Sequence, residues 1–197
     1  MTSLIQYLNS FTYLTDTDKK EFLNLATFEI KNSGDLLITQ GKACDKIYFI
    51  TKGIVRSFYN TYKGETNTYC ITFPENFITA YSSYILGIPN HENMECLTDI
   101  QCFSFHKNEL ETLAQKNTNW LRFQKDMAEM QYIELENRIV QLQNVSAKDR
   151  YLMLFKKHPE FVLNIPVQYI SSYLGITTRH FSRIRKEISL SDKCPTT

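Results

Sequence analysis

The sequence lacks any run of 18 or more apolar residues, so it offers no candidate for a membrane-spanning helix. Its first twenty residues also lack the basic segment followed by an apolar one that marks a secretory signal. The chain has 197 residues, 43% of them hydrophobic, which suits one large domain or a medium domain joined to a small one. We expect a cytoplasmic protein with two modules and no membrane contact.

Patterns that hold a metal or a redox cofactor are absent as well. The five cysteines are scattered, form no CxxC pair and have no histidine at metal-ligand spacing: Cys44, Cys70, Cys96, Cys102 and Cys194. A cupin-type metal enzyme needs an HxH pair near a carboxylate, and none of the four histidines forms one. No Ser-His, Cys-His or paired-carboxylate spacing indicates catalysis. We expect no cofactor, no enzymatic activity, and reduced, mostly buried thiols, with Cys96 and Cys102 in one strand region.

The net charge of the whole chain is only +1, but the charged residues are unevenly distributed. Residues 1–145 carry 13 Lys and Arg against 17 Asp and Glu, a net charge of −4. Residues 146–197 carry 9 against 4, a net charge of +5. A mildly acidic body with a basic C-terminal module suggests that this module binds a polyanion, although on charge alone it is equally a soluble helical end.

Glycine is concentrated in one region, because five of the six glycines fall between residues 34 and 87. They separate short runs rich in Ile, Val, Tyr, Phe and Thr, such as "KIYFIT", "GIVRSFYN" and "TNTYCITF". Such strands indicate a small antiparallel barrel or sandwich. A short helix in "LTDTDKKEFLNLA" precedes them, with Thr15 as its N-cap and Asp18 at the third helical position. "ECLTDIQCFSF" is expected to be the last strand, before a helix in "HKNELETLAQK".

A long segment from about Trp120 to Asn144 contains neither glycine nor proline, and we predict one helix over it. Its apolar surface is wide, with one stripe and an extension beyond it: Ala128, Leu135, Ile139 and Leu142, then Met127, Met130 and Ile133. Two partners fit this width, namely the helix's own barrel and the same helix of a second subunit. An ordinary core helix within one subunit is the alternative. Ser146 then restarts the helix and marks a hinge.

The segment "IPVQYISSYLGITTRHFSRIRKEI", residues 165–188, has the spacing of a helix-turn-helix. Pro166 suits the first turn of one helix, Gly175 its left-handed end, and Thr177 the cap of a second helix. Apolar side chains are predicted to face inward from both helices and the corner between them: Ile170, Leu174, Ile176, Phe181, Ile184 and Ile188. Small Ser171 allows the two helices to cross closely.

The second of these helices leaves a polar and cationic face that fits a major groove. Arginine suits guanine, because its two donors match the O6 and N7 acceptors of that base. A solvated basic helix is the common alternative, but here the cap, the glycine and the apolar positions agree in register. We predict that the DNA-binding residues are Thr177, Thr178, Arg179, His180, Ser182, Arg183, Arg185 and Lys186.

At these residues the chain resembles the Crp/Fnr superfamily of bacterial transcription regulators. "GDLLITQGKACDKIYFITKGIVRSFY" is similar to the opening strands of the cyclic-nucleotide-binding-type barrel, and "LENRIVQLQNVSAKDRYLMLF" to the end of the dimer helix and its hinge. "ISSYLGITTRHFSRIRKEI" is similar to the family's helix-turn-helix. The resemblance implies a homodimer that binds a palindromic DNA operator and contacts RNA polymerase.

The fold that the resemblance implies is α+β, in three parts. An N-terminal antiparallel β-barrel sensor domain, of the double-stranded β-helix or jelly-roll type, is expected over residues 1–118. A dimerisation helix over 119–145 and a helix-turn-helix domain over 146–197 follow. Only nine residues come after Ile188, so the two-stranded wing common in the family is expected to be truncated or absent, and DNA affinity to suffer.

Two further departures from the family concern what the protein binds. Members that bind cyclic AMP hold it with a Gly-Glu pair and an Arg-Ser pair, whereas Thr79 and Ala80 stand at the first pair and no arginine lies between residues 56 and 122. We therefore expect no cyclic AMP binding. The candidate lining of a pocket for another, unassigned small-molecule effector is Thr79, Tyr81, Ser82 and Ser83, and a filled, ligand-free barrel is the equal alternative. Arg179 replaces a usual glutamate, so the operator should differ from the usual family half-site.

Taken together, the sequence favours a homodimeric, sequence-specific DNA-binding transcription regulator. The alternative is a dimeric ligand sensor or scaffold that acts through protein contacts and binds DNA weakly.

Overall fold

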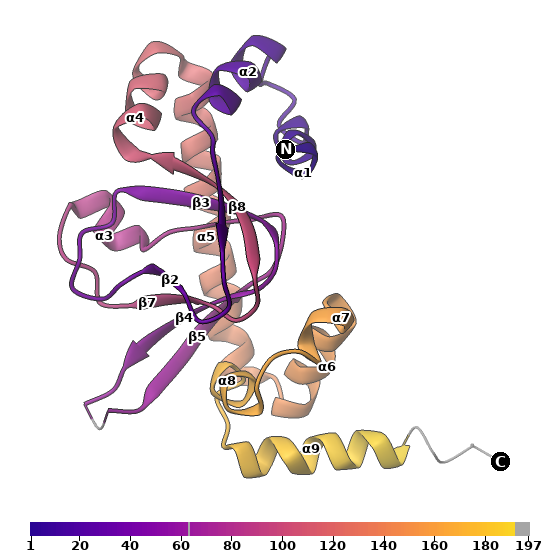
Figure 1. Ribbon diagram of the computed structural model, residues 1–197. Helices are drawn as coiled ribbons and strands as arrows, with labels where there is room; N and C mark the ends of the chain where they lie inside the picture. Colours follow the sequence, from indigo (N-terminus) through magenta and orange to yellow (C-terminus); the bar gives the residue numbers. More distant parts are fainter. Residues whose placement is uncertain (63, 192–197) are drawn as a thin grey trace.

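The computed structural model describes residues 1–62 and 64–191 of the chain, without the side chains of residues 160, 161, 190 and 191. Figure 1 shows a β domain, formed by strands β1 to β8, above a group of C-terminal helices. The long helix α5 (Thr118–Asn144) runs behind the β domain and joins the two parts. In the described part of the chain, no helix is both long enough and apolar enough to cross a membrane.

The β domain consists of two four-stranded sheets in which all neighbouring strands are antiparallel. The first sheet has the order β1 (Thr27–Lys31), β8 (Ile100–His106), β3 (Lys46–Lys52), β6 (Asn76–Ile78). The second has the order β2 (Leu36–Ile38), β7 (Asn93–Cys96), β4 (Val55–Asn60), β5 (Thr66–Thr72). This order is that of a jelly roll, which confirms the predicted α+β fold class. The sheets do not close into a barrel over the described residues, so the predicted barrel is an open roll.

One predicted strand is in fact two. "ECLTDIQCFSF" contains the end of β7 and most of β8, which belong to different sheets. The turn between them is fixed by side chains, because Thr98 Oγ1 accepts from Ile54 N at 3.0 Å and Asp99 Oδ1 accepts from Ser33 N at 2.9 Å. Cys96 and Cys102 therefore lie on separate strands rather than in one strand region.

Helices cover the outer face of the first sheet, where α1 (Thr2–Asn9), α2 (Asp16–Asn24) and α4 (Lys107–Lys116) join the start of α5 (Figure 1). The core there is aromatic, and Phe22 stacks on Phe105 and on Trp120 with ring centroids 4.4 and 4.7 Å apart. Thr15 and Asp18 form the predicted capping box of α2. Helix α1 was not predicted from the sequence, and its Leu4 and Leu8 are fully buried in this core.

The space between the two sheets is filled by a second apolar cluster. Its buried members include Ile38, Tyr48, Ile50, Val55, Ile78, Met94, Cys96, Ile100 and Cys102. Burial raises the pKa of the Cys96 thiol to about 12 and that of Cys102 to about 11. Cys44, Cys96 and Cys102 are buried and Cys70 is half-buried, whereas Cys194 lies outside the described residues. The predicted core thiols are therefore confirmed for three of the five cysteines.

The C-terminal helices are α6 (Ala147–Lys157), α7 (Pro159–Val162), α8 (Val167–Tyr173) and α9 (Thr178–Ser191). Ser146 caps α6 by accepting from Asp149 N at 3.1 Å, as predicted, and His158 ends it. A third apolar cluster holds these helices together and also includes Ile54, Ile71 and Phe73 of the β domain. The C-terminal helices are thus packed against the β domain and not only tethered to it.

Candidate nucleic-acid interface

The turn between α8 and α9 has the capping geometry that the sequence predicted. Gly175 has a φ of 69°, a left-handed conformation that favours glycine. Its N–H donates to Ser172 O at 2.9 Å, and Ile176 N donates to Ser171 O at 3.0 Å, which closes the end of α8. Thr177 Oγ1 accepts from His180 N at 3.2 Å and so caps the start of α9.

The inner faces of α8 and α9 pack as a helix-turn-helix core. Ile170, Leu174, Phe181 and Ile184 are at most 3% exposed and belong to one cluster. Ser171, at the crossing of the two helices, is 1% exposed, and its hydroxyl donates to Val167 O at 2.6 Å. The small residue therefore adds no unpaired polar group to this core.

The outer face of α9 carries the residues predicted to bind DNA. Of these eight residues, His180 is half-buried. The other seven are exposed: Thr177, Thr178, Arg179, Ser182, Arg183, Arg185 and Lys186. The hydroxyl of Thr177 is used by the helix cap, and Ser182 Oγ donates to Thr178 O at 2.9 Å. Figure 1 shows α9 at the outer edge of the C-terminal helices. Nothing else in the described chain covers this face.

The cations on the outer face of α9 are unpaired among the described side chains. The side chains of Arg179, Arg183, Arg185 and Lys186 form no ion pair and no hydrogen bond with residues 1–62, 64–159 or 162–189. The one acid of the helix, Glu187, lies 4.0 Å from Lys148 of α6. The face is therefore positive and available to an anionic partner.

Two arginines fix the helix-turn-helix to the end of α5. Arg150, 9% exposed, donates from Nη2 to Leu174 O at 2.7 Å and from Nη1 to Gln141 O at 3.3 Å and to Val145 O. Arg138 of α5 donates to Tyr173 O, and its guanidinium lies 4.0 Å from the ring centroid of Tyr173. The carbonyls at the end of α8 are thus held by cations from both sides of the predicted hinge. Their role could not be predicted from the sequence, because the carbonyl groups of Tyr173 and Leu174 that they bind lie far away in the chain.

The second half of α5 exposes a row of large apolar side chains. Leu135 and Ile139 are each 56% exposed, and the others include Met130, Tyr132, Ile133, Val140 and Leu142. Met127, predicted to extend this surface, instead packs within the subunit and accepts a hydrogen bond from Tyr7 OH at 3.1 Å. In one subunit, the apolar stripe on α5 lacks a partner among the described residues.

The residues predicted as the lining of an effector pocket lie at the end of β6 and in α3 (Tyr81–Leu86). Thr79 Oγ1 donates to Lys46 O at 2.8 Å, and Ser83 Oγ donates to Ile88 O at 2.5 Å while it accepts from Cys44 N at 2.9 Å. Tyr81 and Ser82 are exposed. Two of the four hydroxyls are thus bonded to the backbone of the roll.

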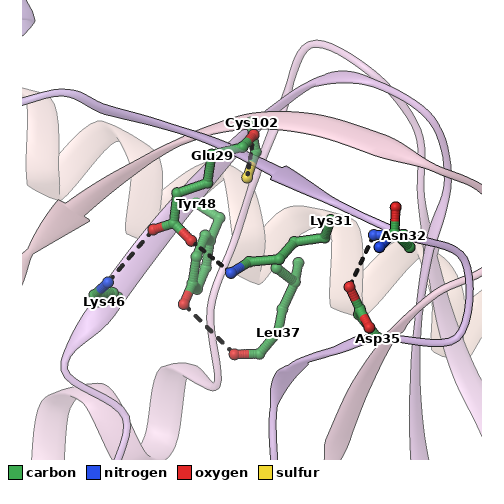
Figure 2. Close-up of polar contacts among 8 residues, drawn as sticks. All are labelled: Glu29, Lys31, Asn32, Asp35, Leu37, Lys46, Tyr48 and Cys102. Atoms are coloured by element: carbon green, nitrogen blue, oxygen red, sulfur yellow. Dashed lines mark hydrogen bonds and ion pairs between the residues drawn. The ribbon is translucent and has the colours of Figure 1, made fainter.

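Charged side chains of the roll pair with one another, as Figure 2 shows around Glu29. Its carboxylate lies 3.0 Å from Lys31 Nζ and 3.4 Å from Lys46 Nζ. Burial alone would raise the pKa of Glu29, but its hydrogen bonds and the two lysine charges outweigh this and lower it. Tyr48 OH donates to Leu37 O at 3.5 Å nearby. No group of three His, Cys, Asp or Glu side chains among the described residues is placed to hold a metal.

Comparison with known proteins agrees with this architecture. Residues 31–117 match the family model of the cyclic nucleotide-binding domain. FixK2 from Bradyrhizobium japonicum superposes with a TM-score of 0.74 at 17% identity, over 87% of this chain and 88% of that one. A regulator of the Crp/Fnr family from Eubacterium rectale gives 0.71 at 13% identity, over 98% and 91%. The c-di-GMP-responsive regulator CLP from Xanthomonas campestris gives 0.69 at 11% identity, over 93% and 96%. A search of curated proteins gave no match.

The predicted resemblance is confirmed: the chain has the fold of the Crp/Fnr transcription regulators over nearly its whole length, and its β domain matches the cyclic nucleotide-binding domain.

Proposed function

We propose that the protein is a homodimeric, sequence-specific DNA-binding regulator of transcription, without enzymatic activity. The observation that carries the proposal is the outer face of α9, where four cations have no described partner and project from a well-packed helix-turn-helix. Such a face supplies phosphate contacts from its cations and base contacts from Arg179, Ser182 and Arg183 near its start. The predicted division into a sensor domain (1–118), a dimerisation helix (119–145) and a DNA-binding domain (146–197) belongs to this proposal.

The exposed apolar stripe on α5 supports the dimer. A helix that leaves Leu135, Ile139 and Leu142 in water gains free energy when the same stripe of a second copy covers them. A two-fold axis along α5 would place two copies of α9 on successive turns of the same face of a DNA duplex. The operator is therefore expected to be palindromic. The family resemblance also implies that the protein, when bound at such a site, contacts RNA polymerase.

We propose that the roll does not bind cyclic AMP. A cyclic phosphate needs a charge-assisted donor, and the region of Thr79 to Ser83 supplies no arginine. The hydroxyls of Thr79 and Ser83 are bonded to the backbone, and apolar side chains fill the space between the sheets. These observations favour the ligand-free roll over a pocket built from Thr79, Tyr81, Ser82 and Ser83.

The alternative function, a sensor or scaffold that acts through protein contacts, has one observation in its favour. The surface of α3 and the residues after it exposes Tyr81, Ile85, Leu86 and Ile88, between 42% and 65% of each side chain. Exposed apolar residues gathered in one place are typical of protein interaction sites.

One substitution separates the two functions. Arg183→Ala should weaken binding to a selected operator by about 1–3 kcal/mol and relax specificity at one base position per half-site, because a bidentate base contact is lost. Lys52→Ala, which removes an exposed cation of the β domain, is the matched control and should bind as the wild type does. Fluorescence anisotropy at one fixed salt concentration measures both. Equal affinity of Arg183→Ala and the wild type would reject Arg183 as a base contact, whereas failure of the wild type to prefer any operator would favour the protein-contact alternative.

A further inference from the structure

Helix α8 has two buried sides with different partners. Ile170, Ser171 and Leu174 face α9 and form the core of the helix-turn-helix. Tyr169 and Ser172, three residues apart, contact the β domain instead. Tyr169 also packs at the margin of the apolar cluster that contains Ile170 and Leu174, whereas Ser172 is not part of that cluster. Ser172 is therefore the position at which the contact with the β domain can be altered with the least change to the packing of α9.

The β-domain partner of Ser172 is β5, the edge strand of the second sheet. Thr68 N donates to Ser172 Oγ at 2.9 Å, and Ser172 Oγ donates to Asn67 Oδ1 at 2.9 Å. An edge strand presents backbone groups that need a partner, and here the first helix of the DNA-binding domain supplies it. Figure 1 shows α8 beside the end of the β domain that holds β4 and β5.

The partner of Tyr169 is a buried cation. Arg56 is 4% exposed, its Nε lies 2.6 Å from Glu95 Oε2, and its guanidinium carbon lies 3.5 Å from the ring centroid of Tyr169. The ring of Phe58 is 4.0 Å from the same carbon. A cation held against an aromatic face away from water is a stronger contact than the same pair in solvent. Phe73 and His158, whose ring centroids are 3.8 Å apart, add a further contact between β5–β6 and the C-terminal helices.

In this arrangement the outer face of α9 is exposed, so the contact between the domains leaves the DNA-binding residues uncovered. It does fix the direction in which α9 points relative to α5. A dimer that binds two half-sites gains affinity when its two recognition helices are already held at the separation of those half-sites.

We propose that Tyr169 and Ser172 are positioning residues, which hold the helix-turn-helix against Arg56, Asn67 and Thr68 of the β domain and thereby set the half-site spacing that the dimer prefers. This inference rests on the proposed function. The choice of operator spacing would then depend on the contact of α8 with β4 and β5, which contains none of the residues expected to touch DNA.

The test is a comparison of operators that differ only in spacing. Binding is measured to DNA with the selected half-sites at their preferred separation and with about 5 base pairs, half a helical turn, inserted between them. For Tyr169→Ala, the ratio of the two affinities should fall on the order of tenfold, equivalent to about 1.4 kcal/mol. Tyr169→Phe keeps the ring over Arg56 and should restore the ratio. Gln168→Ala, an exposed neighbour on α8, should leave it unchanged.

An unchanged ratio in Tyr169→Ala would overturn the proposal. So would an equal loss of affinity at both spacings, because that is the result of a domain that is merely less stable. Ser172→Ala provides a second and smaller change, and it should lower the same ratio in the same direction.

A measurement without DNA separates this inference from the proposed function. Hydrogen exchange of the Thr68 amide reports the contact directly, since this N–H donates to Ser172 across the domain boundary. Its exchange should be at least several-fold faster in Ser172→Ala and in Tyr169→Ala than in the wild type or Gln168→Ala. Equal exchange in all four proteins would reject the contact. Failure of the wild type to bind any operator would reject the proposed function and the spacing preference that rests on it, while faster exchange in the two variants would still support the contact itself.

Discussion

In the β domain several charged side chains pair with one another: Arg56 with Glu95, and Lys31 and Lys46 with Glu29. In the second half of α5 and in α9, by contrast, apolar and cationic side chains are exposed and have no partner among the described residues. We propose that a second copy of the chain covers the apolar stripe on α5 and that a polyanion binds the cations of α9. Substitutions in the β domain should therefore lower stability, whereas substitutions in α5 and α9 should weaken assembly and DNA binding.

The largest effect is expected on assembly. Ile139→Asp places a carboxylate in the α5 stripe of both subunits, where it would be buried near its symmetry mate. The dissociation constant of the dimer should rise by at least about 100-fold, or about 2.7 kcal/mol. Asn137→Asp adds the same charge to an exposed position on the opposite side of α5 and is the control. Sedimentation equilibrium measures both, and an unchanged constant in Ile139→Asp would exclude this stripe from the interface.

The next effect is on stability and comes from the β domain. Arg56→Met leaves Glu95 without its cation in a half-buried position, and the free energy of unfolding should fall by about 2–3 kcal/mol. Lys52→Met removes an exposed cation from β3 and should cost less than about 0.5 kcal/mol. Urea denaturation at one protein concentration compares them. Equal costs would show that internal pairing of charges does not distinguish the β domain.

A smaller effect is expected from the cations of α9. Lys186→Ala should weaken binding to all DNA sequences alike and make the slope of log K against log salt less negative by about 1 per subunit, because one phosphate contact is lost. Its free energy of unfolding should stay within about 0.5 kcal/mol of the wild type, since the residue is exposed. A salt titration of binding is the measurement. A slope equal to that of the wild type would mean that Lys186 does not contact DNA.

The smallest effect is a pH dependence within the β domain. Glu92 is 9% exposed and accepts a hydrogen bond from Tyr69 OH; burial raises its pKa and outweighs that bond. Between the ordinary pKa of about 4.5 and the raised folded value, the native state binds more protons than the unfolded state. The contribution of Glu92 to stability is therefore lost as pH rises through the folded pKa.

The measurement is the unfolding free energy of the wild type minus that of Glu92→Gln, followed from pH 7 down to pH 5. The difference should shift in favour of the wild type on acidification, because the Gln variant does not titrate. A flat difference would contradict the assignment to Glu92. Glu29, whose pKa is lowered, contributes in the opposite direction and is common to both proteins.

Much of the helix-turn-helix could be predicted from the sequence, because its determinants are local. Thr177 caps the helix that starts beside it, and Gly175 adopts the left-handed turn that glycine favours. Thr15 and Ser146 are caps of the same kind. The inward positions follow from a period of 3.6 residues, and Ile170, Leu174, Phe181 and Ile184 are indeed buried.

The failures of prediction come from contacts between residues far apart in the chain. Met127 matches the apolar stripe by spacing, but Tyr7, 120 residues away, holds it within the subunit. The split of "ECLTDIQCFSF" depends on side chains that bond to Ser33 and Ile54. Nothing in the sequence around Arg56 indicates that the ring of Tyr169 packs over its guanidinium. Periodicity locates a face of a helix or strand, but it does not identify what that face contacts.

The most direct test of a dimer that binds a specific operator is selection of bound duplexes from a random DNA library by the purified protein, at one moderate salt concentration. We expect enrichment of a two-fold-symmetric site whose half-sites lie about one helical turn apart, with a guanine contacted by Arg183 in each half. Failure to enrich any sequence, repeated at low salt, would contradict it, since the free cations of α9 would then have no DNA partner.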